Sequence, residues 1–420
     1  MPGKIRGGCA RDMLLPGMET AVSSNSPKDT FRQTKIVFTL GPASSDEKML
    51  EQLILAGVDV CRLNMAHGDQ AWARTMIRRV KEVCQRAGRH IAIMLDIKGP
   101  EIRTGDLPAP VDLAQGQLVD LLPRPGASEN GVLAVGVNYA RFGQDVSAGS
   151  VVLVDSGLIR LEVLSTTASR VHCRVAVAGK LGNRRHINLP GVKVRLPAIT
   201  PKDRADIAVG VEEQVDFFAL SFVREADDVD ILRRVLTDAK SEAHIIAKIE
   251  DQSAIANLDE IIQAADAVMV ARGDLGIEVP MEDLPLIQKK TVDACIRLRK
   301  PVIVATHLLE SMIQSPVATR AEVSDIAGAV WSTADSAMRA RRCPIYAFTD
   351  VPQVFRHLLL VWGVELFLMT FSEEPELTIR NSFDYLMRRG WVKRDDLMVV
   401  VTNVLAGMKI VDTIQMRPVE

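Results

Sequence analysis

From about Thr34 onward, short apolar runs rich in β-branched residues alternate with longer amphipathic stretches. This change of hydrophobic period predicts repeated strand–helix units, which require parallel strands joined by helical crossovers. Seven units favour a (β/α)₈ barrel of the TIM type over an open doubly wound sheet, which remains the structural rival. The expected strands are Lys35–Leu40, Val58–Leu63, Ile91–Asp96, Asp216–Phe222, His244–Ile249, Ala267–Val270 and Val302–Thr306.

Residues 105–195 interrupt this alternation with strand-like pieces separated by Gly, Pro and Asn, so we expect a small all-β domain inserted after the third strand. After about Cys343 the strand-like runs Pro344–Phe348 and Asp396–Thr402 indicate a separate, partial α/β piece. The predicted division is a mobile N-terminal arm at 1–32, the first part of the barrel at 33–104, the β insert at 105–195, the second part of the barrel at 196–338 and a truncated C-terminal α/β domain at 339–420.

Two helix starts carry capping signals. Ser44 and Glu47 have the spacing of a capping box, and Thr200 is followed by Pro201, which suits the first turn of a helix.

Composition and charge exclude several classes of protein. Hydrophobic residues make up 47 % of the 420 residues, so a large core can form, and the formal net charge of −2 gives no basis for non-specific binding to nucleic acid or to a membrane surface. The apolar stretch 358–371 contains Glu365 and is a poor membrane span. The six cysteines are scattered, which favours a reducing compartment. We expect a cytoplasmic protein, with an organelle transit peptide in the first 30 residues as the alternative.

Charged residues collect where the predicted strands end. Glu250 and Asp274 are 24 residues apart, about one strand–helix unit, so neighbouring strands would bring their carboxylates together. One or two carboxylates are the usual protein ligands of Mg²⁺ that also binds substrate phosphate. Lys248 lies two residues before Glu250 and therefore on the same face of the strand. A cation beside a carboxylate-held metal suits phosphoryl transfer, whereas the alternative is a structural Lys–Glu pair.

At this point the sequence resembles the pyruvate kinase family over about residues 33–338, with a weaker match from Arg342 to the end. Two motifs are especially specific: Ala-Lys-Ile-Glu at 247–250 and Met-Val-Ala-Arg-Gly-Asp-Leu-Gly-Ile-Glu at 269–278. The other matching segments are Thr34–Ser45, Arg62–Gly68, Leu95–Thr104, Asn188–Gly191 and Ala305–Met312.

The resemblance implies Mg²⁺-dependent transfer of the phosphoryl group of phosphoenolpyruvate to ADP, giving pyruvate and ATP, by a homo-oligomer that is a tetramer in the family. It also implies that the inserted β domain closes over the site as a lid. By matching position, the catalytic residues are Lys248, Thr306 and Arg62; the substrate-binding residues are Arg62, Lys248, Gly273, Asp274 and Thr306; the nucleotide-binding residues are Asn64, Arg103 and Arg185; the Mg²⁺ ligands are Glu250 and Asp274; and the K⁺ ligands are Asn64, Asp96 and the backbone of Ile97.

Three departures from the family pattern are visible. Ala66 stands where the family has a Ser ligand for K⁺, so the K⁺ site is weakened by one ligand. Arg185 stands where Lys is common, which keeps the charge but changes its geometry. After Met338, about 70 residues of the family pattern are absent, including the eighth strand and helix, which exceeds an ordinary difference in loop length.

Because the missing segment belongs to the barrel wall beside the site, we expect low or no activity from this shortened chain. Two alternatives stay open. One is another Mg²⁺-dependent enolate-handling barrel, such as a phosphoenolpyruvate-utilising lyase or aldolase. The other is a catalytically impaired or silent pyruvate kinase homologue that acts as a subunit or binding protein.

Overall fold

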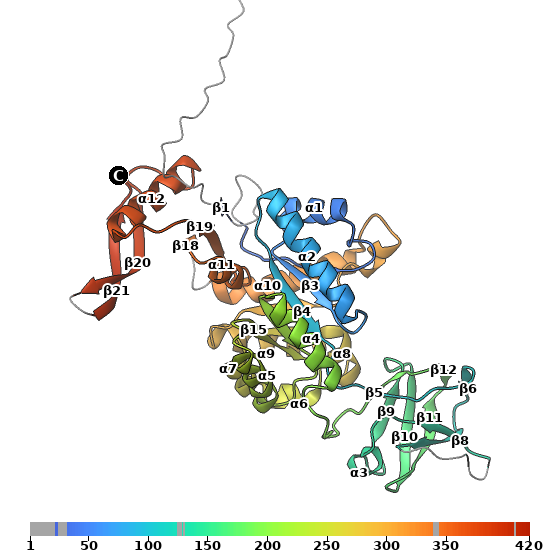
Figure 1. Cartoon of the computed structure of the whole chain (residues 1–420). Coiled ribbons are helices and arrows are strands. Elements are labelled where there is room, and N and C mark those ends of the chain that lie inside the picture. The colour runs from blue at the N-terminus through green and yellow to red at the C-terminus, as the bar shows by residue number, and fades with distance from the viewer. Residues whose placement is uncertain (1–21, 24–31, 124–127, 129–130, 339–343, 407–408) are drawn as a thin grey trace, which may run out of the picture.

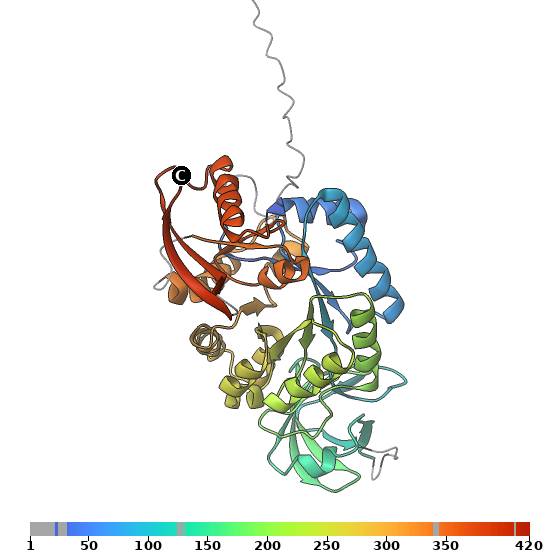
Figure 2. The same cartoon turned by 60° about the vertical axis from the view of Figure 1, so that its left-hand side comes forward.

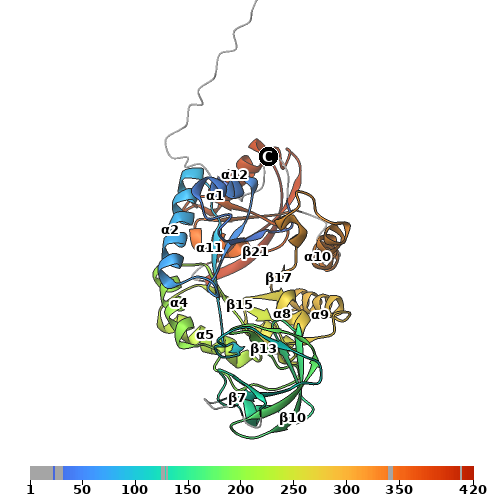
Figure 3. The same ribbon diagram turned by 90° about the vertical axis from the view of Figure 1, so that its right-hand side faces the viewer.

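A curled sheet of seven parallel strands occupies the centre of the molecule, with a β domain below it and the C-terminal elements above it (Figures 1 and 3). The strand order is β17-β16-β15-β14-β4-β3-β2, so each strand–helix unit adds its strand beside the previous one. The strands are β2 (Val37–Leu40), β3 (Val60–Asn64), β4 (Ala92–Ile97), β14 (Phe217–Leu220), β15 (His244–Ile249), β16 (Ala267–Ala271) and β17 (Val302–Ala305). The computed structural model describes residues 22–23, 32–123, 128, 131–338, 344–406 and 409–420.

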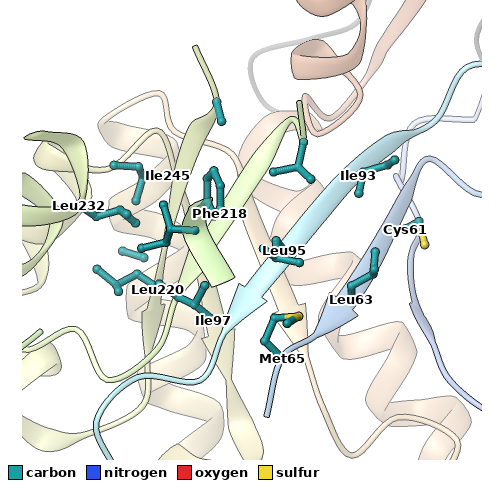
Figure 4. Packing of buried hydrophobic residues seen from close by; sticks show 14 of the residues in the cluster. Cys61, Leu63, Met65, Ile93, Leu95, Ile97, Phe218, Leu220, Leu232 and Ile245 are labelled. Atoms are coloured by element: carbon teal, nitrogen blue, oxygen red, sulfur yellow. The ribbon is translucent and has the colours of Figure 1, made fainter. Parts of the chain in front are cut away.

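Helices cover the outer face of this sheet because every second strand residue is apolar and points toward them. Figure 4 shows Leu63, Leu95 and Leu220 from three neighbouring strands lying side by side in this layer, and all three are fully buried. The helices are α1 (Glu47–Ala56), α2 (Gln70–Ala87), α4 (Pro201–Glu212), α5 (Ala226–Asp238), α6 (Gln252–Ala256), α7 (Leu258–Ala264), α8 (Arg272–Glu278), α9 (Leu284–Arg297) and α10 (Arg320–Met338), with a short 3₁₀ turn η1 (Glu310–Ile313) before α10.

One of the two predicted helix caps is correct. Thr200 and Asp203 form a reciprocal capping box at the start of α4, and Pro201 occupies its first turn. At α1 the prediction is wrong: the N-cap is Asp46, whose carboxylate accepts from the backbone N–H groups of Lys48 and Met49. Ser44 instead accepts a hydrogen bond from the Gly41 N–H in the preceding turn.

The inner face of the sheet, which is turned away from these helices, is covered near the start of its strands by the C-terminal part of the chain. Phe355, on helix α11 (Pro352–Leu358), is fully buried against strand residues such as Met94 and Phe217. Two polar contacts accompany this packing: Arg356 pairs with Asp216 at 2.6 Å, and the rings of His357 and His244 stack at 3.7 Å between centroids. The barrel strands and this C-terminal segment therefore share one hydrophobic core.

The remaining C-terminal elements surround α11. Strands β18 (Ile345–Thr349) and β19 (Val364–Leu368) pair in parallel, and β1 (Val22–Ser23) joins the edge of β19. Helix α12 (Pro375–Arg388) precedes a long antiparallel hairpin of β20 (Leu397–Ala406) and β21 (Lys409–Pro418), which Figure 2 shows projecting along one side of the molecule.

The β domain has its own core and is joined to the barrel by two adjacent strands. Its main sheet has the order β5-β13-β9-β10-β11-β7-β8, and β6 pairs with β12 in a second, two-stranded sheet. The elements are β5 (Ile102–Arg103), β6 (Val111–Leu113), β7 (Leu118–Leu122), β8 (Leu133–Gly136), α3 (Phe142–Asp145), β9 (Val151–Val154), β10 (Ile159–Thr166), β11 (Val171–Val177), β12 (Gly179–Leu181) and β13 (His186–Asn188).

The predicted α/β class is confirmed, and the predicted (β/α)₈ barrel is confirmed in part, as a curled parallel sheet; the open doubly wound alternative is not the arrangement found. Among the described residues, β2 and β17 end the sheet and do not pair with each other, so the strands form a half-barrel rather than a closed cylinder. The exact domain limits remain predictions. Within the described ranges, no helix is both long enough and apolar enough to cross a membrane.

Candidate active site

The inner face of the sheet changes character along its strands. In β3, Val60 is buried in the apolar core, whereas Arg62 and Asn64, two and four residues later, carry polar groups. β4 repeats this order with Met94 and then Asp96. Because strand side chains alternate between faces, these residues share one face, with the polar ones at the carboxyl ends. We call the residues Val60, Ala92, Met94, Phe217, Ala219, Ile246 and Met269 the apolar half of the inner face, and Arg62, Asn64, Asp96, Ser221, Lys248 and Glu250 its polar half.

Asp96 lies at the centre of the polar half. Its carboxylate accepts from Arg62 Nε at 2.6 Å and from Lys248 Nζ at 3.3 Å, and the residue is 1 % exposed. Burial alone would raise the pKa of this carboxyl, but the cations of Lys248 and Arg62 outweigh burial and hold the pKa below its ordinary value. Asp96 therefore remains ionised and fixes two cations in place.

Lys248 is buried among three acceptors. Its ammonium lies 2.8 Å from Glu250 Oε1 and 2.9 Å from Ser221 Oγ, besides its contact with Asp96. Burial opposes the charge, yet the carboxylates of Asp96 and Glu250 together raise the pKa of Lys248 above its ordinary value. The side chain is thus a fixed positive charge at the end of the sheet.

Glu250 and Asp274 form the predicted carboxylate pair. The second oxygen of Glu250, Oε2, accepts from the Phe222 N–H at 2.7 Å, and Asp274 makes no side-chain hydrogen bond or ion pair with the described residues. Burial raises the pKa of both groups, and the charge of Asp274 adds to the effect on Glu250. Two buried carboxyl groups so close together are costly to ionise, and a divalent cation between them would stabilise the ionised form. This pair of donors therefore fits Mg²⁺, with substrate oxygens and water as the other ligands.

The described residues contain no group of three or more His, Cys, Asp or Glu side chains placed to hold a metal ion. Mg²⁺ bound here would therefore depend on the substrate for part of its coordination, as Mg²⁺ sites in phosphoryl-transfer enzymes often do.

Thr306 and Gly273 face each other across the ends of β16 and β17. The Gly273 N–H donates to Thr306 Oγ1 at 2.7 Å, and a Cβ at position 273 would lie only 3.3 Å from that oxygen. The backbone of Thr306 is left-handed, with φ of 68°, which is unusual for a β-branched residue. This close approach and strained turn fix the hydroxyl group at the rim of the site.

The proposed nucleotide-binding residues do not join the Asp96–Lys248 cluster. Asn64 Oδ1 accepts from the Ala66 N–H at 3.0 Å. Arg103 pairs with Glu101 at 2.6 Å, and Arg185 pairs with Asp155 at 3.3 Å. Both arginines belong to the root of the β domain. Whether these arginines reach the site thus depends on the position of the β domain relative to the barrel.

A cavity of about 70 Å³ lies between the β-domain root and the strand ends. Glu250 lines it from the barrel, and Asn188 lines it from β13. Asn188 Nδ2 donates to Glu278 Oε1 at 2.8 Å, which ties the β domain to the end of α8.

Two contributors escaped the sequence prediction. Ser221 donates to the Ile97 carbonyl at 2.7 Å and accepts from Lys248, and its position two residues after Ala219 could have placed it on the inner face. Arg272, within one of the recognised motifs, binds the turn at Thr306, but its partner Asp325 is 53 residues away in the sequence and no local signal marks it.

Two family models match the chain. The model described as pyruvate kinase, barrel domain, matches residues 31–343, and the model described as pyruvate kinase, alpha/beta domain, matches residues 331–416. The barrel model alone covers more than half of the chain.

Individual relatives agree. The plastidial pyruvate kinase 3, chloroplastic, of Arabidopsis thaliana is 48 % identical over 319 residues, covering 76 % of this chain and 56 % of the relative. The pyruvate kinase of Geobacillus stearothermophilus is 46 % identical over 388 residues, covering 90 % of this chain and 65 % of the relative. The chain thus spans a little over half of the length of the plastidial relative.

A solved structure has the same fold. The crystal structure of a pyruvate kinase from Cryptosporidium parvum superposes with a TM-score of 0.85 at 28 % identity, covering 93 % of this chain and 96 % of the other. Both family models match in order along the chain, and the relatives are up to 48 % identical. The chain therefore belongs to the pyruvate kinase family.

Proposed function

We propose that this chain transfers the phosphoryl group of phosphoenolpyruvate to ADP, giving pyruvate and ATP. The observation that carries the proposal is the buried Lys248 ammonium, which lies 2.8 Å from Glu250 and 3.3 Å from Asp96, at the rim that also bears Asp274. Phosphoryl transfer needs fixed positive charge where negative charge spreads over the transferred group.

Glu250 and Asp274 would hold Mg²⁺, which when bound neutralises charge on the phosphoryl oxygens and orients the substrate. Lys248 stays protonated because Asp96 and Glu250 raise its pKa, so it stabilises both the transferring group and the enolate oxygen left behind. Arg62, held by Asp96, binds the substrate phosphate.

The bond between phosphorus and the enol oxygen breaks while an oxygen of the ADP β-phosphate forms the new bond to phosphorus. The enolate of pyruvate remains, and its methylene carbon takes up a proton to give the methyl group. The Thr306 hydroxyl is held at the rim by the Gly273 N–H. There it would contact the substrate carboxylate and lie near the path that delivers this proton.

The nucleotide would be bound by Asn64, Arg103 and Arg185. Both arginines belong to the β-domain root, so closure of that domain as a lid would bring them to the phosphates and exclude water.

For K⁺ we propose Asn64, Asp96 and the Ile97 carbonyl as ligands. The set is weak because Ala66 has no side-chain oxygen, and because the Asp96 carboxylate already pairs with both Arg62 and Lys248. Assembly as a homo-oligomer and location in the cytoplasm stay proposals.

The test is Lys248→Met, assayed by pyruvate formation from phosphoenolpyruvate and ADP. Removal of the fixed charge is expected to lower kcat by about 10³-fold or more. Lys289→Met is the matched control, since Lys289 is exposed on α9 and its ammonium pairs with Asp293 on the same helix. Equal rates for the wild type and Lys248→Met would exclude this site as the source of activity.

The same assay separates the alternatives. A lyase or aldolase would turn over phosphoenolpyruvate without ADP, and a silent homologue would give no pyruvate even when folded. ADP-dependent turnover that is lost in Lys248→Met supports the proposal against both.

A further inference from the structure

The turn that carries Thr306 is held in an unfavourable backbone conformation. Thr306 and His307 both have positive φ angles, 68° and 52°. The left-handed region is most unfavourable for the β-branched Thr306, where it costs on the order of 1 kcal/mol or more. A turn of this kind persists only where surrounding contacts impose it.

Arg272 supplies those contacts from the start of α8. Its Nη2 donates to the Thr306 carbonyl at 2.8 Å, and its Nε lies 3.4 Å from the Ala305 carbonyl. Arg272 is 6 % exposed, so its guanidinium cannot rely on water for its charge.

Asp325 completes the arrangement from α10. Its two oxygens accept from Nη1 and Nη2 of Arg272 at 2.6 and 2.9 Å, a two-bond fork that fixes the plane of the guanidinium. The Asp325 side chain is 41 % exposed, and no sequence motif or matched position assigns it a role. Loss of this carboxylate would leave a buried guanidinium with only carbonyl partners.

Glu322, one turn earlier on α10, holds the far end of the same loop. Its carboxylate accepts from the N–H groups of Ser311 and Thr319 at 2.7 Å each. The first turns of α10 thus bind the Thr306 loop directly at Ser311, and through Arg272 at Thr306 itself.

We propose that Asp325 is a positioning residue for the reaction: by orienting Arg272 it holds the Thr306 hydroxyl where the enolate of pyruvate is protonated. The proposal rests on the proposed function and extends it to a residue outside the recognised motifs. Asp325 itself contacts no reacting atom and acts only through Arg272.

The chemical test isolates proton transfer from phosphoryl transfer. Bound pyruvate loses a methyl proton to form the enolate, and in D₂O the enolate takes up a deuteron in its place. NMR measures the rate at which the methyl group is labelled. Asp325→Ala is expected to lower this exchange and kcat by a similar factor of about 10- to 100-fold, because a small misplacement of a reacting group has that effect. KM for ADP should change by less than about twofold, since the nucleotide residues lie elsewhere.

Two further variants show whether the loss of exchange depends on the Asp325 carboxylate. Asp325→Asn keeps the shape and one acceptor, so its loss should be smaller, and it serves as the test if Asp325→Ala fails to fold. Asp293→Ala, an exposed acid on α9, is the matched control and should retain wild-type exchange. Unchanged exchange in Asp325→Ala, or a rise in KM for ADP that accounts for the whole loss, would overturn the proposal.

A structural measurement needs no catalytic activity. Amide hydrogen exchange of residues 302–314 should accelerate about tenfold in Asp325→Ala, whereas the β domain should be unaffected. Unchanged protection of 302–314 would also overturn the proposal. If the wild type transfers no phosphoryl group but this segment loosens in the variant, the proposed function fails while the clamp on Thr306 stands.

Discussion

The apolar and polar halves of the inner face lie on the same strands but are filled differently. Phe355 and its neighbours on α11 bury the apolar half, so residues there contribute to stability through packing. In the polar half, Asp96, Lys248 and Glu250 are buried at a cost in hydration, and their mutual contacts return only part of it. The difference indicates that the apolar half stabilises the fold. The polar half lowers the stability of the fold and supplies the charged groups of the proposed site.

The largest expected effect is the loss of kcat caused by Asp274→Asn, at the site that adjoins the polar half. If Asp274 holds Mg²⁺ as proposed, loss of its carboxylate should lower kcat by about 10³-fold or more. Burial, together with the nearby charges of Asp96 and Glu101, raises the pKa of Asp274, so a neutral amide should increase the free energy of unfolding in the absence of metal. Steady-state kinetics and urea unfolding without metal measure the two effects. A marked loss of stability would break the comparison.

Phe355→Ala tests the apolar half. Removing a fully buried Phe should lower the free energy of unfolding by about 3–5 kcal/mol and should leave KM for both substrates near wild type in the folded fraction. Phe371→Ala is the control, because Phe371 is 40 % exposed and should cost much less. Unfolding of the C-terminal elements alone, with the barrel intact, would show that the two do not share one core.

Glu278, at the β-domain end of the site, should make stability depend on pH. Burial raises its pKa from 4.5 to about 7, helped by Asp251 and Asp274. The folded chain therefore binds this proton more tightly than the unfolded chain. The resulting stability is complete below pH 4.5 and is lost as pH rises through about 7, by at most about 3 kcal/mol.

Unfolding of wild type and Glu278→Gln at several pH values measures this contribution. The Gln variant cannot titrate there and should show a flatter dependence. Parallel curves for the two proteins would contradict the prediction.

The smallest effect is expected for Ala66→Ser at the edge of the polar half. A hydroxyl at this exposed position would add a fourth ligand to the proposed K⁺ site, so half-maximal activation should need about tenfold less K⁺. Stability should stay within about 0.5 kcal/mol. Activity titrated with KCl gives the result, with Ala71→Ser on the first turn of α2 as control. No change in K⁺ requirement would mean that K⁺ does not bind at this place.

Much of the barrel could be predicted because its strands bury one or both faces and read as β-branched runs with clear ends. The pairing of Lys248 with Glu250 followed from the two-residue period of a strand. Contacts made by packing could not be predicted in this way. Asp325 meets Arg272 only because α10 packs beside α8, and Ser44 lost the cap of α1 to Asp46, which is also a good capping residue.

The placement of α11 was also missed. The structure shows a seven-residue helix there, followed by the apolar segment that contains β19. No local pattern in the sequence indicates that Phe355 packs against Met94 and Phe217, which lie more than 130 residues earlier. A piece that reads as a separate small domain therefore shares the core of the barrel.

The covering of the inner face by residues 352–366 has a consequence for synthesis. A ribosome delivers the sheet strands first and this segment later, at roughly 5–20 residues per second. For several seconds the apolar side chains of Met94 and Phe217 on the nascent half-barrel are not covered by α11. The growing chain should therefore engage chaperones at this stage, and should acquire protease resistance only after α11 leaves the exit tunnel.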